Sequence, residues 1–344
     1  MRFIRPLFPG NSPVHIFFLG ALVGMFSFWI LDIRRSSEQL IVRNIYDFDD
    51  YVKPQKFHND PETGHHEGED ILAADLAKKV RVFVFVLTSP RNKMTKAIPV
   101  KTTWARRFDG YLFISSENDK DLPAIRAVES ESRDNLWEKT RQGLIHAYQA
   151  EIDKYDYFMK ADDDTFVIVE NLRYLLAGKN PNEPFLMGRR FKTFIKQGYT
   201  SGGAGYVLSR AGLRLIAEGM IREISGCRKH YGPEDVNLGK CAEAVGVQIH
   251  DSLDEHQQEV FHPFRPTSMF NKGFMDRISW IHAYNYFPVK TGLDCCSDHT
   301  VSFHYVNPSE MYALEFLIYH LYPYGITRDI KQYEKARQLR NSQK

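Results

Sequence analysis

The chain has 344 residues, which is enough for one large catalytic domain or two ordinary ones. It is 43% hydrophobic, 26% charged and 13% aromatic, so it can bury a sizeable core, and a disordered, collagen-like or low-complexity chain is excluded. Lysine and arginine number 45 against 43 aspartate and glutamate, a balance that gives no electrostatic footprint for nucleic acid. The four cysteines suffice for one or two disulfides in a lumenal domain.

An apolar run lies close to the N-terminus. Residues 14–31 include no formally charged side chain, and as a helix they would rise about 27 Å, enough for a bilayer core. The run is longer than a usual signal-peptide core and no small-residue cleavage pattern follows it, so an uncleaved anchor is favoured over a cleaved signal peptide or a buried core helix. We therefore predict a cytoplasmic tail over 1–13 and a signal-anchor transmembrane helix over 14–33.

A polar, irregular segment follows over residues 34–79. It lacks sustained hydrophobic periodicity, so it predicts a stem between the membrane and a folded domain. His65, His66 and Glu67 could bind a metal, but a mobile loop rarely holds ligands in place, and a solvated tether is the favoured interpretation.

From residue 80 onward, strands and helices alternate. The pattern predicts one α/β domain over 80–325 whose sheet has parallel members, with ligands bound beyond the carboxyl ends of the strands. A basic tail follows over 326–344. The predicted strands are 81–88, 109–115, 155–161 and 183–188, and the predicted helices are 98–107, 134–150 and 171–177.

Three adjacent carboxylates form the strongest local signal. Asp162, Asp163 and Asp164 follow an apolar strand, where they need a compensating cation or solvent. In extended geometry Asp162 and Asp164 point the same way and Asp163 the opposite way, so the outer pair could bind Mg²⁺ or Mn²⁺ together with nucleotide phosphates. A solvated acidic turn, or Asp164 as a helix cap, remains open.

Three further motifs occur downstream. The glycines of 201–205 allow a close approach to a ligand or form a tight turn. Pro233 is placed to open a helix whose first turn carries Glu234 and Asp235, which could act chemically or complement the helix dipole. His304 is expected within a late strand, with Phe303 and Tyr305 on the opposite face, as a ligand or as a core histidine.

Taken together, these motifs resemble the β1,3-glycosyltransferase superfamily that includes fringe. The resemblance covers about residues 80–324 and is closest to the core 1 β1,3-galactosyltransferases, through the runs at 285–290 and 295–298. A membrane anchor with a lumenal catalytic domain also fits this family. The shared motifs lie at 102–107, 158–176, 201–209, 232–241 and 304–308.

The resemblance implies a GT-A, Rossmann-like domain behind the N-terminal helix and stem. It also implies an inverting, metal-dependent galactosyltransferase that moves galactose from UDP-galactose to the 3-hydroxyl of GalNAc on serine or threonine. The implied metal is Mn²⁺, with Mg²⁺ as the alternative. By the same resemblance, Asp162, Asp164 and His304 hold the metal, Asp235 is the general base, Thr88, Arg91, Lys101, Asp162 and Gly203 bind the donor, and Trp280 and Tyr305 contact the acceptor.

The implied location is the Golgi membrane, as a single-pass type II protein acting on GalNAc-modified glycoproteins. The oligomeric state stays open, with a homodimer as one arrangement. Two other functions remain: a fringe-like transferase that uses UDP-GlcNAc, and a catalytically inactive lumenal chaperone of the same fold. An inactive relative should lack one of the acidic motifs, and both are intact here.

The cysteine content of this chain differs from that of the family in one respect. The relatives usually carry a cysteine pair near the motif at 102–107, and this chain has Arg107 and no cysteine there. A bond between Cys227 and Cys241 would clamp the loop with the proposed base, whereas four free thiols are the alternative. Whether the adjacent Cys295 and Cys296 bond each other stays open.

Overall fold

The computed structural model describes residues 71–228, 232–321 and 323. The chain divides into two compact units, 1–57 and 58–344, and every described residue belongs to the second. The predicted cytoplasmic tail, anchor helix and C-terminal tail, with the stem up to residue 70, lie outside the described residues. Within the described ranges, no helix is long and apolar enough to cross a membrane.

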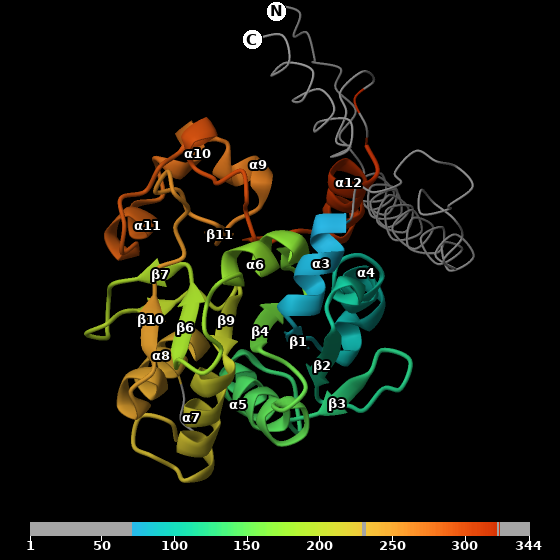
Figure 1. Ribbon diagram of the computed structural model, residues 1–344, viewed down its shortest axis with the longest axis vertical. Helices are drawn as coiled ribbons and strands as arrows, with labels where there is room; N and C mark the ends of the chain where they lie inside the picture. The colour runs from blue at the N-terminus through green and yellow to red at the C-terminus, as the bar shows by residue number, and fades with distance from the viewer. Residues whose placement is uncertain (1–70, 229–231, 322, 324–344) are drawn as a thin grey trace, which may run out of the picture. The chain divides into compact units, whose positions relative to one another are not determined.

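A seven-stranded sheet organises this unit (Figure 1), in the order β10-β6-β9-β4-β1-β2-β3. Strands β4, β1, β2 and β3 are parallel, β10 is parallel to β6, and β9 runs antiparallel to both β4 and β6. The prediction of an α/β sheet with parallel members is confirmed. The strands are β1 Val82–Leu87, β2 Gly110–Ser115, β3 Ala124–Arg126, β4 Tyr157–Asp162, β6 Phe185–Gly188, β9 Tyr206–Ser209 and β10 Gln248–His250.

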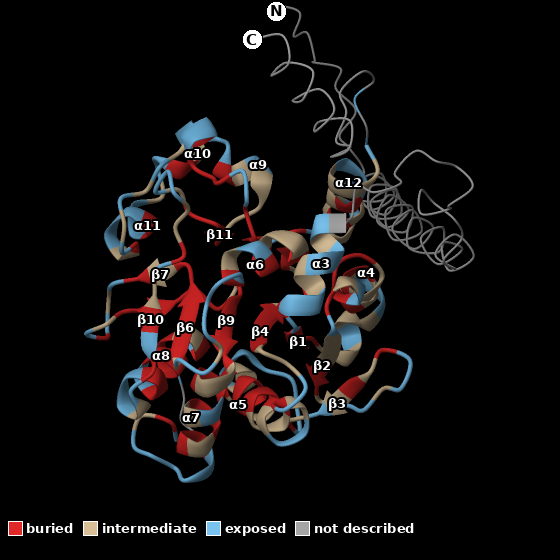
Figure 2. Ribbon diagram, viewed as in Figure 1, coloured by how far each residue is buried: buried red, intermediate tan, exposed pale blue. Residues whose placement is uncertain are grey.

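Strand β1 separates two hydrophobic cores. Its three valines face a core shared with α4 and α6, while its two phenylalanines and Leu87 face a core shared with α5, α7 and α8. Both faces of this parallel strand are covered, so all six of its residues are apolar and buried (Figure 2). The helices are α4 Ile98–Thr102, α5 Leu136–His146, α6 Val169–Leu176, α7 Arg210–Ile221 and α8 Glu234–Val245.

Smaller elements complete the domain. One small sheet has the order β11-β12-β5, and β7 pairs with β8 in another. The strands are β5 Phe166–Val167, β7 Arg190–Phe191, β8 Tyr199–Thr200, β11 Phe261–His262 and β12 Ser302–Phe303. The remaining α-helices are α9 Pro266–Met269, α10 Lys272–Met275, α11 Ser279–Tyr284 and α12 Pro308–Tyr319, and the short helical turns are η1 Pro90–Asn92, η2 Lys93–Ala97, η3 Ala105–Arg107, η4 Arg133–Asn135, η5 Ala147–Glu151 and η6 Gly292–Asp294.

The prediction of an irregular stem was wrong for its last residues. Ile71–Lys79 forms a helix, α3, which lies against α6 (Figure 1). Leu76 packs on the hydrophobic core and its carbonyl accepts from the backbone N–H of Val80 at 2.9 Å. A helix with so few buried side chains has little hydrophobic periodicity, so this helix could not be predicted from the sequence pattern.

The expected strand around His304 is also shorter than predicted. Strand β12 ends at Phe303, and Tyr305 has a φ of 57°, a left-handed value that few non-glycine residues adopt. The rings of His304 and Tyr305 stack with centroids 3.9 Å apart, so the prediction that they lie on opposite faces was wrong. The left-handed turn at Tyr305 therefore sets its ring against the ring of His304.

Both cysteine pairs are bonded. The Cys227–Cys241 disulfide is confirmed, and it joins the segment after α7 to the middle of α8. Cys295 and Cys296 bond each other, which the sequence had left undecided. The four cysteines of the chain are thereby accounted for.

Arg107 anchors the helix α12 to η3. Its guanidinium donates to Glu315 Oε1 at 2.6 Å and lies over the ring of Tyr319, 3.5 Å from the centroid. Arg106 donates to the same carboxylate oxygen at 3.0 Å, and Glu315 is buried. An ion pair with a cation–π contact therefore holds this region.

We expect Arg107→Met to lower the free energy of unfolding by about 2 kcal/mol, because a buried carboxylate loses its closest charged donor. Urea unfolding of the purified protein measures this change. Arg133→Met, at an exposed arginine, is the matched control and should stay within about 0.5 kcal/mol of wild type. An equally small change in Arg107→Met would contradict the anchoring role.

Candidate active site

The acidic triplet lies where β4 and β1 end together. Asp162 is in register with Leu87, so the residues after these two parallel strands meet at one edge of the sheet. Thr88 Oγ1 donates to Asp163 across this edge at 2.8 Å. Ligands of open α/β sheets bind beyond such carboxyl ends.

Asp162, Asp164 and His304 form a group that could hold a metal. Each offers one ligand atom, and these atoms all lie within 4.8 Å of one another. His304 Nε2 is 3.2 Å from Asp164 Oδ1 and 3.9 Å from Asp162 Oδ2. Two carboxylates and an imidazole suit a divalent cation such as Mn²⁺. The structure thus brings together the three residues that the sequence proposed as ligands.

Neighbouring groups keep Asp164 ionised. Burial works against its charge, yet His304 and Lys96 hold the pKa of this carboxyl below its usual range. Lys96 Nζ is 2.9 Å from Asp164 Oδ2, the oxygen that does not face His304. Asp164 is therefore ionised across the physiological pH range and keeps one oxygen on the side of the metal group.

Asp163 has a different role. Its carboxylate accepts from Thr88 Oγ1 at 2.8 Å and from Asn92 Nδ2 at 2.9 Å. It is buried, and burial raises its pKa to about 6 although Lys96 opposes this. The middle carboxylate therefore ties the segment after β1 to the end of β4, in agreement with the predicted alternation along the triplet.

The glycine-rich loop at 201–205 fits against both acidic motifs. A Cβ on Gly203 would lie 2.0 Å from His304 Cε1, and one on Gly202 would lie 2.4 Å from Glu234 Oε2. Thr165 Oγ1 fixes the loop by donating to the Gly203 carbonyl at 2.8 Å. Glycine is needed here because side chains at these positions would displace His304 and Glu234.

Glu234 and Asp235 open helix α8 as predicted. Glu234 is buried and accepts from Tyr206 Oη at 2.8 Å and Thr140 Oγ1 at 3.0 Å. Burial raises the pKa of Asp235, although backbone N–H groups, first that of Val236, lower it in part. A carboxylate with a raised pKa at the edge of a site is a suitable general base.

Two predicted donor residues are not brought to the acidic group. Arg91 is exposed on η1, next to the Asn92 that contacts Asp163. Lys101 donates to the carbonyl oxygen of Asp121, on the side of the β2–β3 connection. Lys96 instead supplies the ammonium beside the carboxylates.

An open hollow of about 500 Å³ lies between the end of β3 and the start of α5. Lys139 connects it to the acidic edge, because its ammonium donates to the Thr88 carbonyl and, at 2.8 Å, to Glu131. The size lies within the range of small-molecule pockets. The hollow is lined by Arg126, Ala127, Val128, Glu129, Ser130, Asn135 and Glu138.

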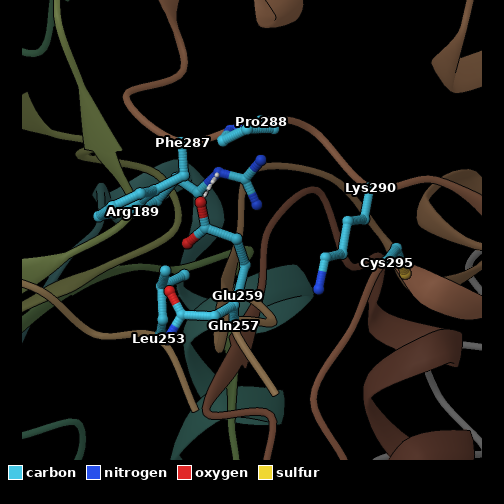
Figure 3. A pocket seen from close by; sticks show the side chains of 8 residues that line it. All are labelled: Arg189, Leu253, Gln257, Glu259, Phe287, Pro288, Lys290 and Cys295. Atoms are coloured by element: carbon cyan, nitrogen blue, oxygen red, sulfur yellow. Dashed lines mark ion pairs between the residues drawn. The ribbon is translucent and has the colours of Figure 1, made fainter. Parts of the chain in front are cut away.

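A second, enclosed cavity has a structural explanation (Figure 3). Arg189 points toward Glu259, with Nε 3.4 Å from Oε1, and donates to Asn285 Oδ1 at 2.7 Å. Cys295 and Lys290 form part of its wall. The space holds about one water molecule, so this buried ion pair supports the fold.

The two predicted acceptor residues are joined by a third aromatic side chain. Phe264 lies between Tyr305 and Trp280, with ring centroids 6.3 Å and 5.8 Å away. Tyr305 is 52% exposed and Trp280 42% exposed, so both side chains are partly open to solvent. The cluster begins beside His304, since Tyr305 stacks on its ring. Aromatic faces exposed next to a metal group are suited to stacking against a sugar ring.

Sequence reasoning missed Lys160, Lys96, Asn92 and Phe264 as members of the site. Lys160 could have been identified from the sequence, because it is a charged residue within an apolar strand. It lies two residues before Asp162, so both side chains are expected on the same face of the strand. The others carried none, since their proximity depends on how the turns η1, η2 and the segment after β11 fold.

The chain is similar to a protein-family model and to several known proteins. The family model described as Fringe-like matches residues 77–311. The glycoprotein-N-acetylgalactosamine 3-beta-galactosyltransferase 1 of Xenopus laevis is 42% identical over 270 residues, which cover 77% of this chain and 74% of the relative. The human beta-1,3-glucosyltransferase is 26% identical over 219 residues, which cover 62% of this chain and 42% of that relative.

Among solved structures, the galactosyltransferase LgtC in complex with donor and acceptor sugar analogues is similar with a TM-score of 0.39 and 9% identity. The alignment covers 70% of this chain and 98% of that chain.

Proposed function

We propose that this chain, which belongs to the Fringe-like family, is an inverting transferase that moves galactose from UDP-galactose to the 3-hydroxyl of GalNAc linked to serine or threonine. The frog galactosyltransferase, which matches most of the chain, supports the choice of sugars. The observation that carries the proposal is that the glycine loop lies against both the metal group and Asp235. A Cβ on Gly203 would meet His304, and one on Gly202 would lie 3.5 Å from the Cβ of Asp235.

Asp162, Asp164 and His304 would hold the metal, with Mn²⁺ favoured and Mg²⁺ as the alternative. When bound, the metal supplies positive charge that neutralises the departing diphosphate. Lys96, held beside Asp164, adds a protein cation at the same place. The nucleoside would extend from Thr88 toward the hollow between β3 and α5.

Asp235 is the proposed general base. In a single displacement, the acceptor oxygen forms a bond to the anomeric carbon of galactose while the bond to the diphosphate oxygen breaks. Asp235 takes the proton of the acceptor hydroxyl, and the negative charge leaves with UDP. Trp280 and Tyr305 would orient the acceptor GalNAc by stacking, and the backbone of Gly203, which packs on His304, would lie close to the donor sugar.

The test is a donor panel with a GalNAc-peptide acceptor, in Mn²⁺ and in excess EDTA. We expect transfer from UDP-galactose in Mn²⁺ and none in EDTA. Transfer from UDP-GlcNAc alone would instead establish a fringe-like specificity, and binding without transfer from any donor would establish an inactive relative of the same fold.

We also propose a Golgi location, with an N-terminal anchor and the catalytic domain in the lumen. The apolar run at 14–31 and the lumen-compatible disulfides support this layout. Protease treatment of intact microsomes tests it with a C-terminal tag. The tag should survive until detergent is added, and its digestion without detergent would contradict the layout.

A further inference from the structure

Lys160 carries a buried charge at the centre of the candidate site. It lies on β4 with 2% of its side chain exposed. A buried ammonium is costly unless it is paired and hydrogen-bonded, so its partners must satisfy it fully. The three contacts of its Nζ are Asp162 Oδ1 at 2.8 Å, the Gly202 carbonyl oxygen at 3.1 Å and Glu234 Oε2 at 3.7 Å.

The contact with Asp162 fixes how that carboxylate points. Lys160 takes Oδ1, while Oδ2 is the oxygen that faces His304 at 3.9 Å. Asp162 therefore keeps one oxygen on the side of the metal group. In metal sites, loss of a partner that orients a ligand in this way typically lowers metal affinity by about 10–100-fold.

Glu234, the second carboxylate near Lys160, is also held in place. Glu234 is held by Tyr206 and Thr140, from β9 and α5, and it directly precedes Asp235 on α8. The Gly202 carbonyl belongs to the loop that packs on His304 through Gly203. One ammonium group therefore touches the strand with the metal ligands, the glycine loop and the start of the helix with the base.

We propose that Lys160 is a positioning residue, which holds Asp162 in the orientation that metal binding needs and fixes it relative to the start of α8. The inference rests on the proposed function, because it takes Asp162 as a metal ligand. Lys160 acts through Asp162 and has no contact with substrate in this role.

The test measures binding of Mn²⁺ itself, by the electron paramagnetic resonance signal of the free ion, in the full chain with UDP present. We expect Lys160→Met to weaken Mn²⁺ binding by about 10–100-fold. A purely electrostatic role predicts the opposite sign, because removing a positive charge strengthens the attraction of the site for a cation. The sign of the change therefore separates positioning from charge.

Two further variants control this measurement. Glu234→Gln keeps the shape of the side chain and leaves Lys160 on Asp162, so Mn²⁺ affinity should stay within about threefold of wild type. Lys160→Met with Glu234→Gln removes both buried charges, so it avoids the unpaired buried carboxylate that the single lysine variant leaves at Glu234, and it should show the same weakening. Arg173→Met removes a buried cation near the start of β1 and β2, where its partners are Asp109 and the carbonyl oxygens of Val80 and Arg107, and it should leave Mn²⁺ affinity unchanged.

Unchanged or tighter Mn²⁺ binding in Lys160→Met or in the double variant would overturn the proposal. Weakening in Glu234→Gln equal to that in Lys160→Met would also overturn it, because Asp162 would then not depend on Lys160 specifically. If the wild-type protein itself bound no Mn²⁺ with UDP, the metal assignment of the proposed function would fail, and this inference with it.

Discussion

Asp164→Asn should abolish galactosyl transfer and weaken UDP binding together. The substitution keeps the shape of the side chain but removes the charge that faces His304 and Lys96. Losing a metal ligand forfeits several kcal/mol of charge stabilisation at the leaving diphosphate, which corresponds to a fall in kcat/KM of about 10²–10³-fold or more. Steady-state kinetics and UDP titration in Mn²⁺ measure the two losses.

Asp153→Asn, at an exposed aspartate outside the site, is the matched control and should behave as wild type. The thermal stability of Asp164→Asn should be close to that of wild type, so that lost activity reports the site and not the fold. Normal transfer by Asp164→Asn, or full wild-type activity in excess EDTA, would refute the metal assignment.

Asp235→Asn should cause a loss that is concentrated in turnover. Without the base, kcat should fall by about 10²–10⁴-fold, while UDP affinity stays nearly unchanged because the metal group is intact. The contrast with Asp164→Asn is informative, since that variant loses both quantities. An equal loss of UDP binding in Asp235→Asn would make this residue a donor-site or structural acid.

The pH profile gives Asp235 a second signature. A general base must be ionised, and burial raises the pKa of this carboxyl above its ordinary value of 3.8. Activity should therefore be lost as the pH falls through the raised pKa, at a higher pH than for an exposed aspartate. The residual activity of Asp235→Asn should lack this acid limb, and an unchanged limb would assign it to another group.

The sequence predicted the parts of the molecule that depend on local pattern. The apolar run of β1 predicted a strand buried on both faces, and the alternation of Asp162, Asp163 and Asp164 predicted which carboxylates share a side. Family motifs supplied His304, whose place next to Asp164 no local pattern could have shown.

The sequence could not predict features that depend on tertiary packing. Two of the three partners of Lys160, Glu234 and the Gly202 carbonyl, come from α8 and the glycine loop, which are distant in the chain. The left-handed backbone of Tyr305 redirects a segment that reads as a continuous strand, and it sets this ring against His304. Arg107 stands at a motif without the cysteines expected from the resemblance, and its ion pair with Glu315, more than 200 residues along the chain, could not be predicted.

The most direct test of the proposed reaction is the structure of its product. The purified protein is incubated with UDP-galactose, Mn²⁺ and a peptide that carries a single α-linked GalNAc, and the product is analysed by nuclear magnetic resonance. The proposed mechanism predicts one added galactose, in β configuration, on the 3-hydroxyl of GalNAc. A galactose in α configuration, a linkage to another hydroxyl, or no transfer under these conditions would contradict it.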